Sequence, residues 1–556
     1  MQLTHVNGDV KSYTLPPDGT KLLLTVRPLR DPLEAEKLAQ SGILYDGSFL
    51  FPHNRNVVSE VLATKQGPTE MLVHEIVSGK ERPATEEEIA QLGPWLSDLD
   101  EKILDPLSGG SIEGHHIVDA KISPDRRLVA YRYLPKNYAE ARGRVYLLFV
   151  KPVKGGSPIE LPLPADAWLV IDYWWGRDSN SVYYIQADAD GRSPKLMVID
   201  VAGGTARQVY ADRDYVSSCS VDQSARFTAC GREGPTAPKQ IALVDLALGS
   251  VRELVDLNPE FRTLTLSQPV RIEGINRYGD KWFAHVVKPL NYEPGKRYPT
   301  ILTTYRSGDY FLRGASGDEN PIQVYAAHGF AVLSFDMGHD RYAEIKPGDF
   351  QDFLIAVSSP VASMEMAIQK GVEMGIVDPQ RVGVSGYSRG TEQVAYAISH
   401  TKLFSAASGA TASTSPCLYY VSPNYVRKTL AAYGLGGWPD GVARSRWMTF
   451  AAPLNADRIQ TPLLDNDPDS EVLFDLSLYT ALRELKKPVE LFIYPNELHH
   501  INQPKHRYEM YDRNLDWFRF WLKSEEDPDP TKATQYIRWD ELRKLQQENQ
   551  DGLPAD

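Results

Sequence analysis

The sequence predicts a β-rich N-terminal half followed by a C-terminal half of the α/β class. From about Gly19 to Phe261 it consists of short alternating strands, which Asp, Asn, Gly and Pro interrupt about every dozen residues. After about Leu266, short apolar runs alternate with helical patterns, which is typical of buried parallel strands joined by helices. The length of 556 residues also exceeds what one compact core takes, so at least two domains are expected.

Repeated units in the N-terminal half indicate the blades of a β-propeller. Three stretches, beginning at about His115, Trp168 and Ser217, each contain two strands, a turn and two further strands, at a period of about fifty residues. The segment around Lys21 is a candidate for another blade, which gives at least three blades and as many as five. Because so few blades do not fill a typical ring, residues 1–265 are predicted to form a β-propeller that is incomplete or lacks residues that would close it.

Composition excludes several classes of protein. Sixty Lys and Arg residues against 73 Asp and Glu residues give a net charge of −13, so a nucleic-acid surface is not expected. No run approaches the ~18 apolar residues of a membrane span. The first twenty residues also lack a charged start followed by an apolar run. We therefore expect a soluble protein without membrane insertion and with no visible leader.

Two local features of the N-terminal half allow a functional and a structural interpretation. Cys219 and Cys230, two of three cysteines, flank a hairpin-like segment in which a disulfide would need an oxidising compartment. The preferred interpretation is that both are reduced strand residues. Thr85 and Glu88 predict a capping box at the start of a helix, rather than an anchor for a substrate's amino terminus.

The C-terminal half is predicted to be a doubly wound α/β sheet over residues 266–523. Its expected strands are the apolar runs YPTILTTY, GFAVLSFD, RVGVSG, TPLLD and PVELFIYP. Residues 524–556 are predicted to be a polar tail that carries one helix at most and lies at the periphery.

The motif Gly386-Tyr387-Ser388-Arg389-Gly390 predicts a serine nucleophile. It stands between an apolar strand and a helical pattern, which is the context of the nucleophile elbow in an α/β-hydrolase domain. Its glycines permit a tight turn that holds the serine hydroxyl clear of the backbone, and the helix that follows points its N-terminus at a developing oxyanion. A plain tight turn without a catalytic role is the alternative.

In this fold the acid and then the histidine follow the serine along the chain. His499 comes first in the loop after the final predicted strand and is favoured as the general base over His500. Asp469 and Glu471 both follow the preceding strand, and spacing alone does not separate them as the acid. The two acidic residues nearer that strand are expected only to solvate the loop; they are Asp465 and Asp467.

Acyl transfer also needs hydrogen-bond donors for the oxyanion. The backbone N–H of Arg389, directly after the serine, is one predicted donor. The phenol of Tyr305, at the end of an early strand, is the other, although Tyr305 as an ordinary strand-end aromatic is the alternative. Arg306 or Arg313 is a candidate to bind a substrate carboxylate.

With these segments placed, the chain resembles the prolyl oligopeptidase family of serine peptidases, in which a propeller precedes an α/β-hydrolase domain. Tyr298-Pro299, five residues and Tyr305 match a family pattern that makes Tyr305 the oxyanion donor, and Asp469 occupies the general family's acid position. The runs YRSGDYFLRGASGDENPIQVYAAHGFAVLSFD and SGYSRGTEQVAYAISHTKLFSAASGA resemble the lasso-peptide isopeptidase branch. That branch implies Glu471 as the acid, with Asp469 in reserve.

The resemblance implies hydrolysis of the amide that joins a lasso peptide's N-terminal amine to an Asp or Glu side chain, through an acyl-enzyme on Ser388. It implies no metal or organic cofactor, and a bacterial protein of the cytoplasm or periplasm. The alternative function is a dipeptidyl or acylaminoacyl peptidase of the same family that cuts α-peptide bonds. A binding protein that retains the peptidase shape without catalysis is a third hypothesis.

Overall fold

The computed structural model contains two compact units, which divide between Leu257 and Asn258. Described residues up to Leu257 form the first unit, except for 234–238, which group with the second. The described residues are 8–14, 20–28, 70–88, 116–135, 144–188, 194–210, 214–222, 226–307, 320–338, 341–411, 415–416, 424–436, 441–495, 497–501 and 503–551.

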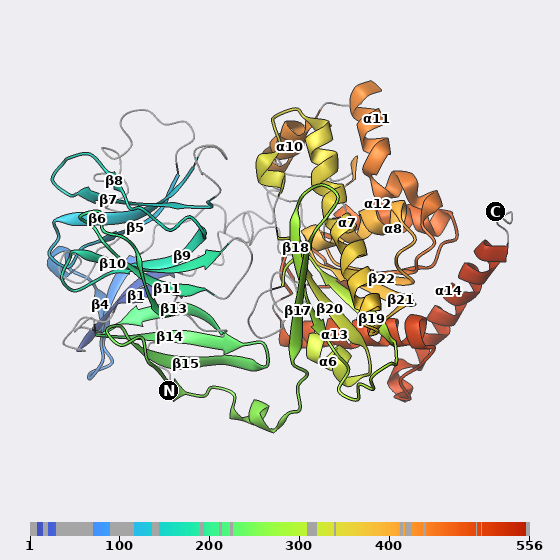
Figure 1. The fold of residues 1–556 in the computed structure, drawn as a ribbon, viewed down its shortest axis with the longest axis horizontal. Helices are drawn as coiled ribbons and strands as arrows, with labels where there is room; N and C mark the ends of the chain where they lie inside the picture. The colour runs from blue at the N-terminus through green and yellow to red at the C-terminus, as the bar shows by residue number, and fades with distance from the viewer. Residues whose placement is uncertain are drawn as a thin grey trace. The chain divides into compact units, whose positions relative to one another are not determined.

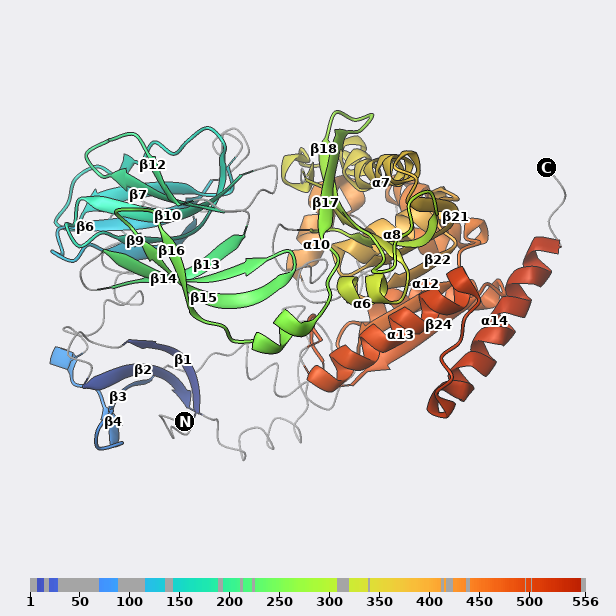
Figure 2. The same ribbon diagram turned by 60° about the horizontal axis from the view of Figure 1, so that its bottom comes forward.

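The described residues of the N-terminal unit form four four-stranded antiparallel sheets, in each of which successive strands are neighbours (Figure 1, Figure 2). Their strands are β1 (Gly8–Thr14), β2 (Lys21–Pro28), β3 (Glu70–Glu75), β4 (Glu81–Pro83), β5 (His116–Ile122), β6 (Leu128–Leu134), β7 (Leu147–Pro152), β8 (Ile159–Glu160), β9 (Ala167–Trp175), β10 (Ser181–Asp188), β11 (Lys195–Asp200), β12 (Arg207–Tyr210), β13 (Tyr215–Val221), β14 (Phe227–Gly234), β15 (Ala237–Asp245) and β16 (Val251–Val255). The last three sheets are the three repeated units, and the first contains the segment around Lys21. Since such a sheet is the structure of a propeller blade, the predicted N-terminal fold is confirmed.

The expectation of two reduced cysteines is wrong, because Cys219 on β13 and Cys230 on β14 form a disulfide. Their Cα atoms are 4.1 Å apart across the two strands. The register of β13 against β14 shifts between Ser217 and Ser220, and Ser218 has a φ of 51°. A bulge of this kind re-aims side chains locally, so the pairing was not evident from sequence spacing.

The predicted capping box at Thr85 and Glu88 is confirmed. The Thr85 N–H donates to Glu88 Oε2 at 3.1 Å, and the Glu88 N–H donates to Thr85 Oγ1 at 3.2 Å. Arg82 Nη2 lies 2.6 Å from Glu88 Oε1, so this carboxylate is bound by residues next to it in the chain.

The C-terminal unit is built on one eight-stranded sheet with the order β17-β18-β20-β19-β21-β22-β23-β24. Strand β18 is antiparallel to both β17 and β20, and the remaining neighbours pair in parallel. The strands are β17 (Pro269–Ile275), β18 (Lys281–Val287), β19 (Tyr298–Thr304), β20 (Ala331–Asp336), β21 (Val377–Gly386), β22 (Ala406–Gly409), β23 (Leu463–Pro468) and β24 (Val489–Tyr494). The predicted α/β-hydrolase domain is therefore confirmed.

Helices cover both faces of this sheet (Figure 1). Side chains alternate along each strand, so Leu302 packs with helices α7, α8 and α12, and Ile301 packs with α6 and α13 on the other face. The helices and helical turns are η2 (Pro259–Thr263), α6 (Ile322–Ala327), η3 (Arg341–Glu344), α7 (Phe350–Glu373), α8 (Arg389–His400), α10 (Asn424–Leu430), η4 (Ala431–Leu435), α11 (Gly441–Phe450), η5 (Ala452–Arg458), α12 (Val472–Glu484), α13 (Pro504–Lys523), η6 (Pro530–Lys532) and α14 (Ala533–Asp551). None of the described helices has both the length and the apolar content to cross a membrane.

The C-terminal segment is not peripheral, contrary to expectation. Its helix α14 buries Tyr536, Trp539 and Leu542 in the same core cluster as α13, and Trp539 is 0% exposed. The rings of Trp517 and Trp539 pack edge to face with centroids 5.1 Å apart. These residues are spaced three apart, and Leu545, three residues further on, packs against the same cluster, which gives α14 one narrow buried face.

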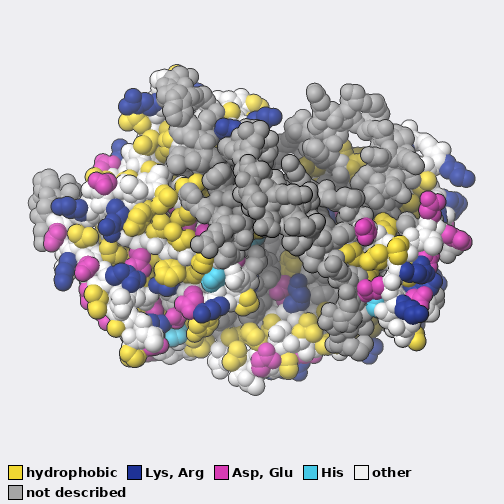
Figure 3. Space-filling model, turned by 180° about the vertical axis from the view of Figure 1, so that it is seen from behind, with side chains coloured by type: hydrophobic (Ala, Val, Ile, Leu, Met, Phe, Trp, Pro, Cys, Tyr) yellow, Lys and Arg dark blue, Asp and Glu magenta, His cyan; other side chains and the backbone are white. Residues whose placement is uncertain are grey.

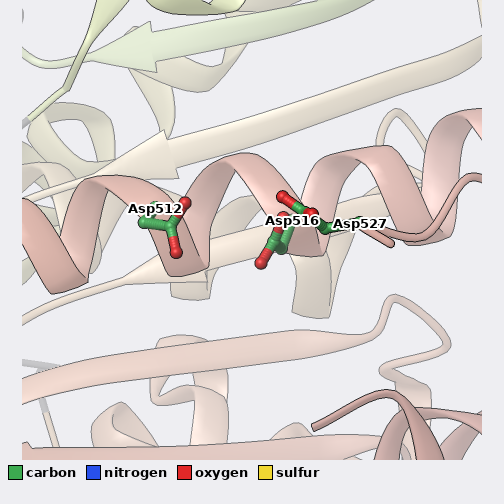
Figure 4. Close-up of side chains that lie close together, drawn as sticks. All are labelled: Asp512, Asp516 and Asp527. Carbon is green, nitrogen blue, oxygen red and sulfur yellow. The ribbon is translucent and has the colours of Figure 1, made fainter. Parts of the chain in front are cut away.

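Three carboxylates gather on α13 and in the segment that follows it, as Figure 4 shows. The ammonium of Lys532 binds all three, at 2.7 Å from Asp512, 2.8 Å from Asp516 and 3.1 Å from Asp527. Burial opposes the lysine's charge, but these hydrogen bonds outweigh it and raise the pKa of Lys532. The cluster is thus an ion-pair network that anchors the start of α14.

Candidate active site

Ser388 lies at a sharp turn between β21 and α8. Its φ of 55° and ψ of −124° fall where residues with a side chain are rarely found. A Cβ added to Gly386 would lie 2.4 Å from the carbonyl carbon of Gly390, and one added to Gly390 would lie 2.6 Å from Thr304 O. Both positions need glycine, because the strand, the turn and the helix approach too closely for a side chain.

The backbone of the turn is held by the segment after β22. The Ser388 N–H lies 2.9 Å from Ala410 O and 3.1 Å from Thr411 Oγ1. The Thr411 N–H in turn donates to Asp467 Oδ1 at 2.8 Å, and Thr411 has a φ of 62°. The serine's own amide is therefore engaged within the fold.

His499 and Glu471 lie side by side. His499 Nδ1 is 2.9 Å from Glu471 Oε2 and 3.1 Å from Oε1. The carboxylate side chain is 9% exposed, whereas the imidazole is 41% exposed. A proton on Nδ1 that is donated to this carboxylate fixes the tautomer in which Nε2 can accept a proton from a serine.

The other acid that the spacing allowed lies at the base of the histidine loop. Asp469 Oδ1 accepts a hydrogen bond from the Glu497 N–H at 3.3 Å, and the Asp469 N–H donates to Tyr494 O at 3.0 Å. Glu497 Oε1 lies 2.8 Å from His506 Nδ1 on α13. Asp469 therefore joins the acid loop to the histidine loop.

Asp465 and Asp467 do not solvate the loop, and that expectation is wrong. Both belong to β23, and they are 1% and 0% exposed. Burial first, and then the nearby carboxyl of Asp475, raises the pKa of each well above its ordinary value. Sequence reasoning ended the strand too early and so placed these residues in solvent.

Tyr305 lies directly against the serine turn. It follows β19, whose last residue Thr304 pairs with Gly386 at the end of β21. Its ring atom Cδ1 is 3.3 Å from the position that a Cβ on Gly390 would take. The Met337 N–H donates to Tyr305 O at 3.2 Å, which ties this turn to the end of β20.

The charged side chains around this turn have partners. Arg306 Nη1 lies 3.9 Å from Asp336 Oδ1, and burial raises the pKa of Asp336 despite that neighbour. The guanidinium of Arg389 lies 4.0 Å from the centre of the Tyr342 ring, a residue that sequence reasoning did not single out. Arg313 lies outside the described residues.

Sequence reasoning also missed Tyr387, whose phenol donates a hydrogen bond to the carbonyl oxygen of His499. The residue occupies the variable position of the serine motif, where no sequence signal requires an aromatic side chain. Thr411 was likewise missed, because its contact with the serine amide joins segments far apart in the chain.

Comparison with known proteins agrees with this fold. The profile of the prolyl oligopeptidase family matches residues 359–525, which contain the serine turn, the acid loop and the histidine loop. The C-terminal domain belongs to the prolyl oligopeptidase family. The lasso peptide isopeptidase AtxE2 of Asticcacaulis excentricus is 33% identical over 400 residues, which cover 68% of this chain and 56% of that protein. The chain thus spans little more than half the length of this curated relative of the family.

Solved structures also have a fold similar to that of this chain. The apo structure of the AtxE2 isopeptidase has a TM-score of 0.74 at 27% identity and covers 98% of this chain and 80% of that one. A serine-to-alanine variant of AtxE2 with Astexin3-dC4 bound gives the same TM-score of 0.74. The acylaminoacyl peptidase of Pyrococcus horikoshii, at a TM-score of 0.61 and 14% identity, covers 94% of this chain and 83% of that one and shares the fold.

Proposed function

We propose that this protein is a serine isopeptidase that opens the macrolactam ring of a lasso peptide and releases the linear peptide. Two observations carry the proposal. Both Glu471 oxygens contact His499 Nδ1, and Ser388 lies in a strained turn between a strand and a helix. Similarity to a lasso peptide isopeptidase over 68% of the chain supports the substrate class. The substrate would be the amide between the N-terminal amine and an Asp or Glu side chain.

In the first half of the proposed reaction, His499 Nε2 takes the proton of Ser388 while Oγ attacks the side-chain acyl carbon of the ring. The Glu471 carboxylate holds the imidazole and stabilises its protonated form. The oxyanion that forms accepts hydrogen bonds from the Tyr305 phenol and the Arg389 N–H. Collapse expels the N-terminal amine, which takes its proton from His499 and leaves an acyl-enzyme.

In the second half, water enters where the amine has left. His499 accepts a proton from the water, whose oxygen attacks the acyl carbon, and Ser388 leaves with the proton that the imidazole returns. The net change is the addition of one water to the ring, which restores a free carboxylic side chain and a free amino terminus. No α-peptide bond of the substrate is cut.

Products from a panel of threaded lasso peptides test the proposal. Mass spectrometry should show a gain of one water, and fragmentation should show a linear chain instead of a ring. Chromogenic dipeptidyl and acylaminoacyl substrates serve as the comparison, and Ser388→Ala as the inactive control. Cleavage of the chromogenic substrates alone would replace the isopeptidase by an ordinary peptidase of the family. Failure of a fluorophosphonate to label Ser388 would favour a binding protein.

We also propose that the protein works in an oxidising compartment, the bacterial periplasm. The cross-strand disulfide between Cys219 and Cys230 supports this, since such bonds persist where thiols are not kept reduced. Alkylation of the unfolded, unreduced protein from its native host should modify one of the three cysteines, Cys417. Modification of all three in freshly lysed cells would place the protein in a reducing compartment.

A further inference from the structure

One side chain of the serine turn reaches the backbone of the candidate base. Tyr387 directly precedes Ser388 and is 2% exposed. Its hydroxyl donates to the carbonyl oxygen of His499, and its ring meets the His499 ring edge to face at a centroid distance of 5.9 Å. The same ring stacks on His500, with centroids 6.2 Å apart and planes 4° apart.

Other contacts fix the histidine loop on either side of His499. Before it, Glu497 binds His506 Nδ1 at 2.8 Å and accepts the Gln503 N–H at 3.0 Å. After it, Ile501 O accepts hydrogen bonds from Arg507 Nε at 3.2 Å and Nη2 at 3.1 Å. The partners in these contacts belong to α13 or to its N-cap residue, Gln503, whereas the Tyr387 hydroxyl belongs to the serine turn.

We infer that Tyr387 is a positioning residue, whose hydroxyl sets the separation between the nucleophile Ser388 and the base His499. The inference rests on the proposed serine chemistry and goes beyond it, because it assigns the variable residue of the serine motif a role in assembling the site. The Tyr387 hydroxyl binds the backbone of His499. It joins the two chain segments that carry the proton donor and the proton acceptor.

The geometry favours this role over simple core packing. Tyr387 and Tyr494 belong to one apolar cluster and are both almost fully buried, but the Tyr494 hydroxyl is directed to Asn466 Oδ1 at 3.3 Å. A packing role would make the two hydroxyls equivalent. A positioning role makes the Tyr387 hydroxyl alone matter for the reaction, since a shift of about 1 Å between reacting groups can cost about 100-fold in rate.

The closing experiment compares Tyr387→Phe with the matched control Tyr494→Phe. Both variants keep the ring and lose one buried hydroxyl. Fluorophosphonate labelling of Ser388 measures assembly of the nucleophile and base without any peptide substrate, and lasso peptide turnover separates kcat from KM. Tyr387→Phe should slow labelling and kcat by about 10-fold to 100-fold, with KM changed less than about 3-fold. In the Tyr494→Phe variant, Ser388 should be labelled at the wild-type rate, although its Tm should shift by about as much as that of Tyr387→Phe.

The pH dependence of labelling gives a second measurement. Because the hydroxyl binds a backbone carbonyl and not the imidazole, Tyr387→Phe should lower the rate at every pH and leave the midpoint of the profile in place. Tyr387→4-aminophenylalanine keeps a donor and should recover most of the lost rate. If Tyr387→Phe does not fold, the 4-aminophenylalanine variant tests the inference. Labelling near the wild-type rate supports the positioning role of Tyr387, and a loss of 10-fold or more overturns it.

The outcomes separate this inference from the proposed substrate. Labelling of Tyr387→Phe within about 2-fold of wild type, or an equal loss in Tyr494→Phe, overturns the positioning role. A wild-type protein that labels but cleaves no lasso peptide refutes the substrate and leaves the labelling comparison valid. A wild-type protein that does not label at all overturns both.

Discussion

Carboxyl groups have opposite surroundings in the N-terminal blades and at the strand ends of the C-terminal sheet. Around β9 to β11, Lys195 binds Asp166 at 3.0 Å and Asp188 at 2.7 Å, and so joins neighbouring strands. At the end of β23, Asp465 and Asp467 are buried beside other carboxyls that disfavour their ionisation. The blades use paired charges for cohesion, whereas β23 buries carboxyl groups whose ionisation is unfavourable.

The difference shows where the fold accepts a cost in stability. Asp336 at the end of β20 accepts a hydrogen bond from the Ser307 N–H, and Glu471 after β23 contacts His499. Asp467 in β23 accepts a hydrogen bond from the Thr411 N–H, in the segment that holds the serine turn. Ligand and catalytic sites of open α/β sheets lie at this edge. Burial raises the pKa of Asp336 and Asp467, and neighbouring carboxyls raise that of Asp467 further.

The largest expected effect concerns the choice of the acid. Glu471→Gln should lower kcat/KM by about 10³-fold to 10⁴-fold, because the amide neither fixes the histidine tautomer nor stabilises the imidazolium. Asp469→Asn should lower it by less than about 10-fold, since its contact is with the loop backbone. Steady-state kinetics on the same substrate compare the two, and loss of turnover in Asp469→Asn alone would reverse the assignment.

The next largest expected effect comes from removing the disulfide between Cys219 and Cys230. Replacing both Cys219 and Cys230 by Ser should lower the free energy of unfolding by about 2–4 kcal/mol, because the unfolded chain regains the freedom of the closed loop. Urea denaturation of the wild type with and without reductant measures the same quantity. Equal stability of the oxidised wild type and the double variant would show that the bond contributes nothing to the N-terminal unit.

A pH-dependent effect is expected at the strand end. The pKa of Asp465 is raised in the folded state, so the folded chain keeps a proton that the unfolded chain releases above about pH 4. Stability should therefore fall as the pH rises above about 4, by about 1.4 kcal/mol per unit of pKa difference. Asp465→Asn should make this decline shallower without removing it, since Asp467 keeps a raised pKa of its own. The variant should be more stable than the wild type at pH 9, as measured by chemical denaturation. A decline of the same slope in the variant would contradict the account.

The smallest effect has the opposite sign and lies in the blades. Burial opposes the charge of Asp166, but Lys195 outweighs it and lowers the pKa of Asp166. Its contribution is present above about pH 4 and is lost as the pH falls through the folded-state pKa. Because the side chain is 54% exposed, Asp166→Asn should cost less than about 1 kcal/mol at pH 7, and less again as the pH falls through the folded-state pKa. A larger cost at the lower pH would contradict the pairing.

Much of the fold was predictable because its signals are local. The four-strand period of the blades and the change to strands alternating with helices were both predicted before the structure, and both are confirmed. The turn around Ser388 was predictable for the same reason, since glycine at 386 is required by its close approach to Gly390, four residues further on. Glu471 and Asp469, by contrast, were not separable by spacing, and the catalytic roles stay predictions.

The sequence by itself determined the order of the parts, the kind of sheet in each half and the turn that presents Ser388. Only the tertiary structure decided which carboxylate contacts His499, that Cys219 meets Cys230, that α14 buries Trp539, and that Tyr387 reaches the histidine loop. The physical reason is range. Strands, turns and helix starts follow from neighbours a few residues apart, whereas these contacts depend on the register and packing of segments that are distant in the chain.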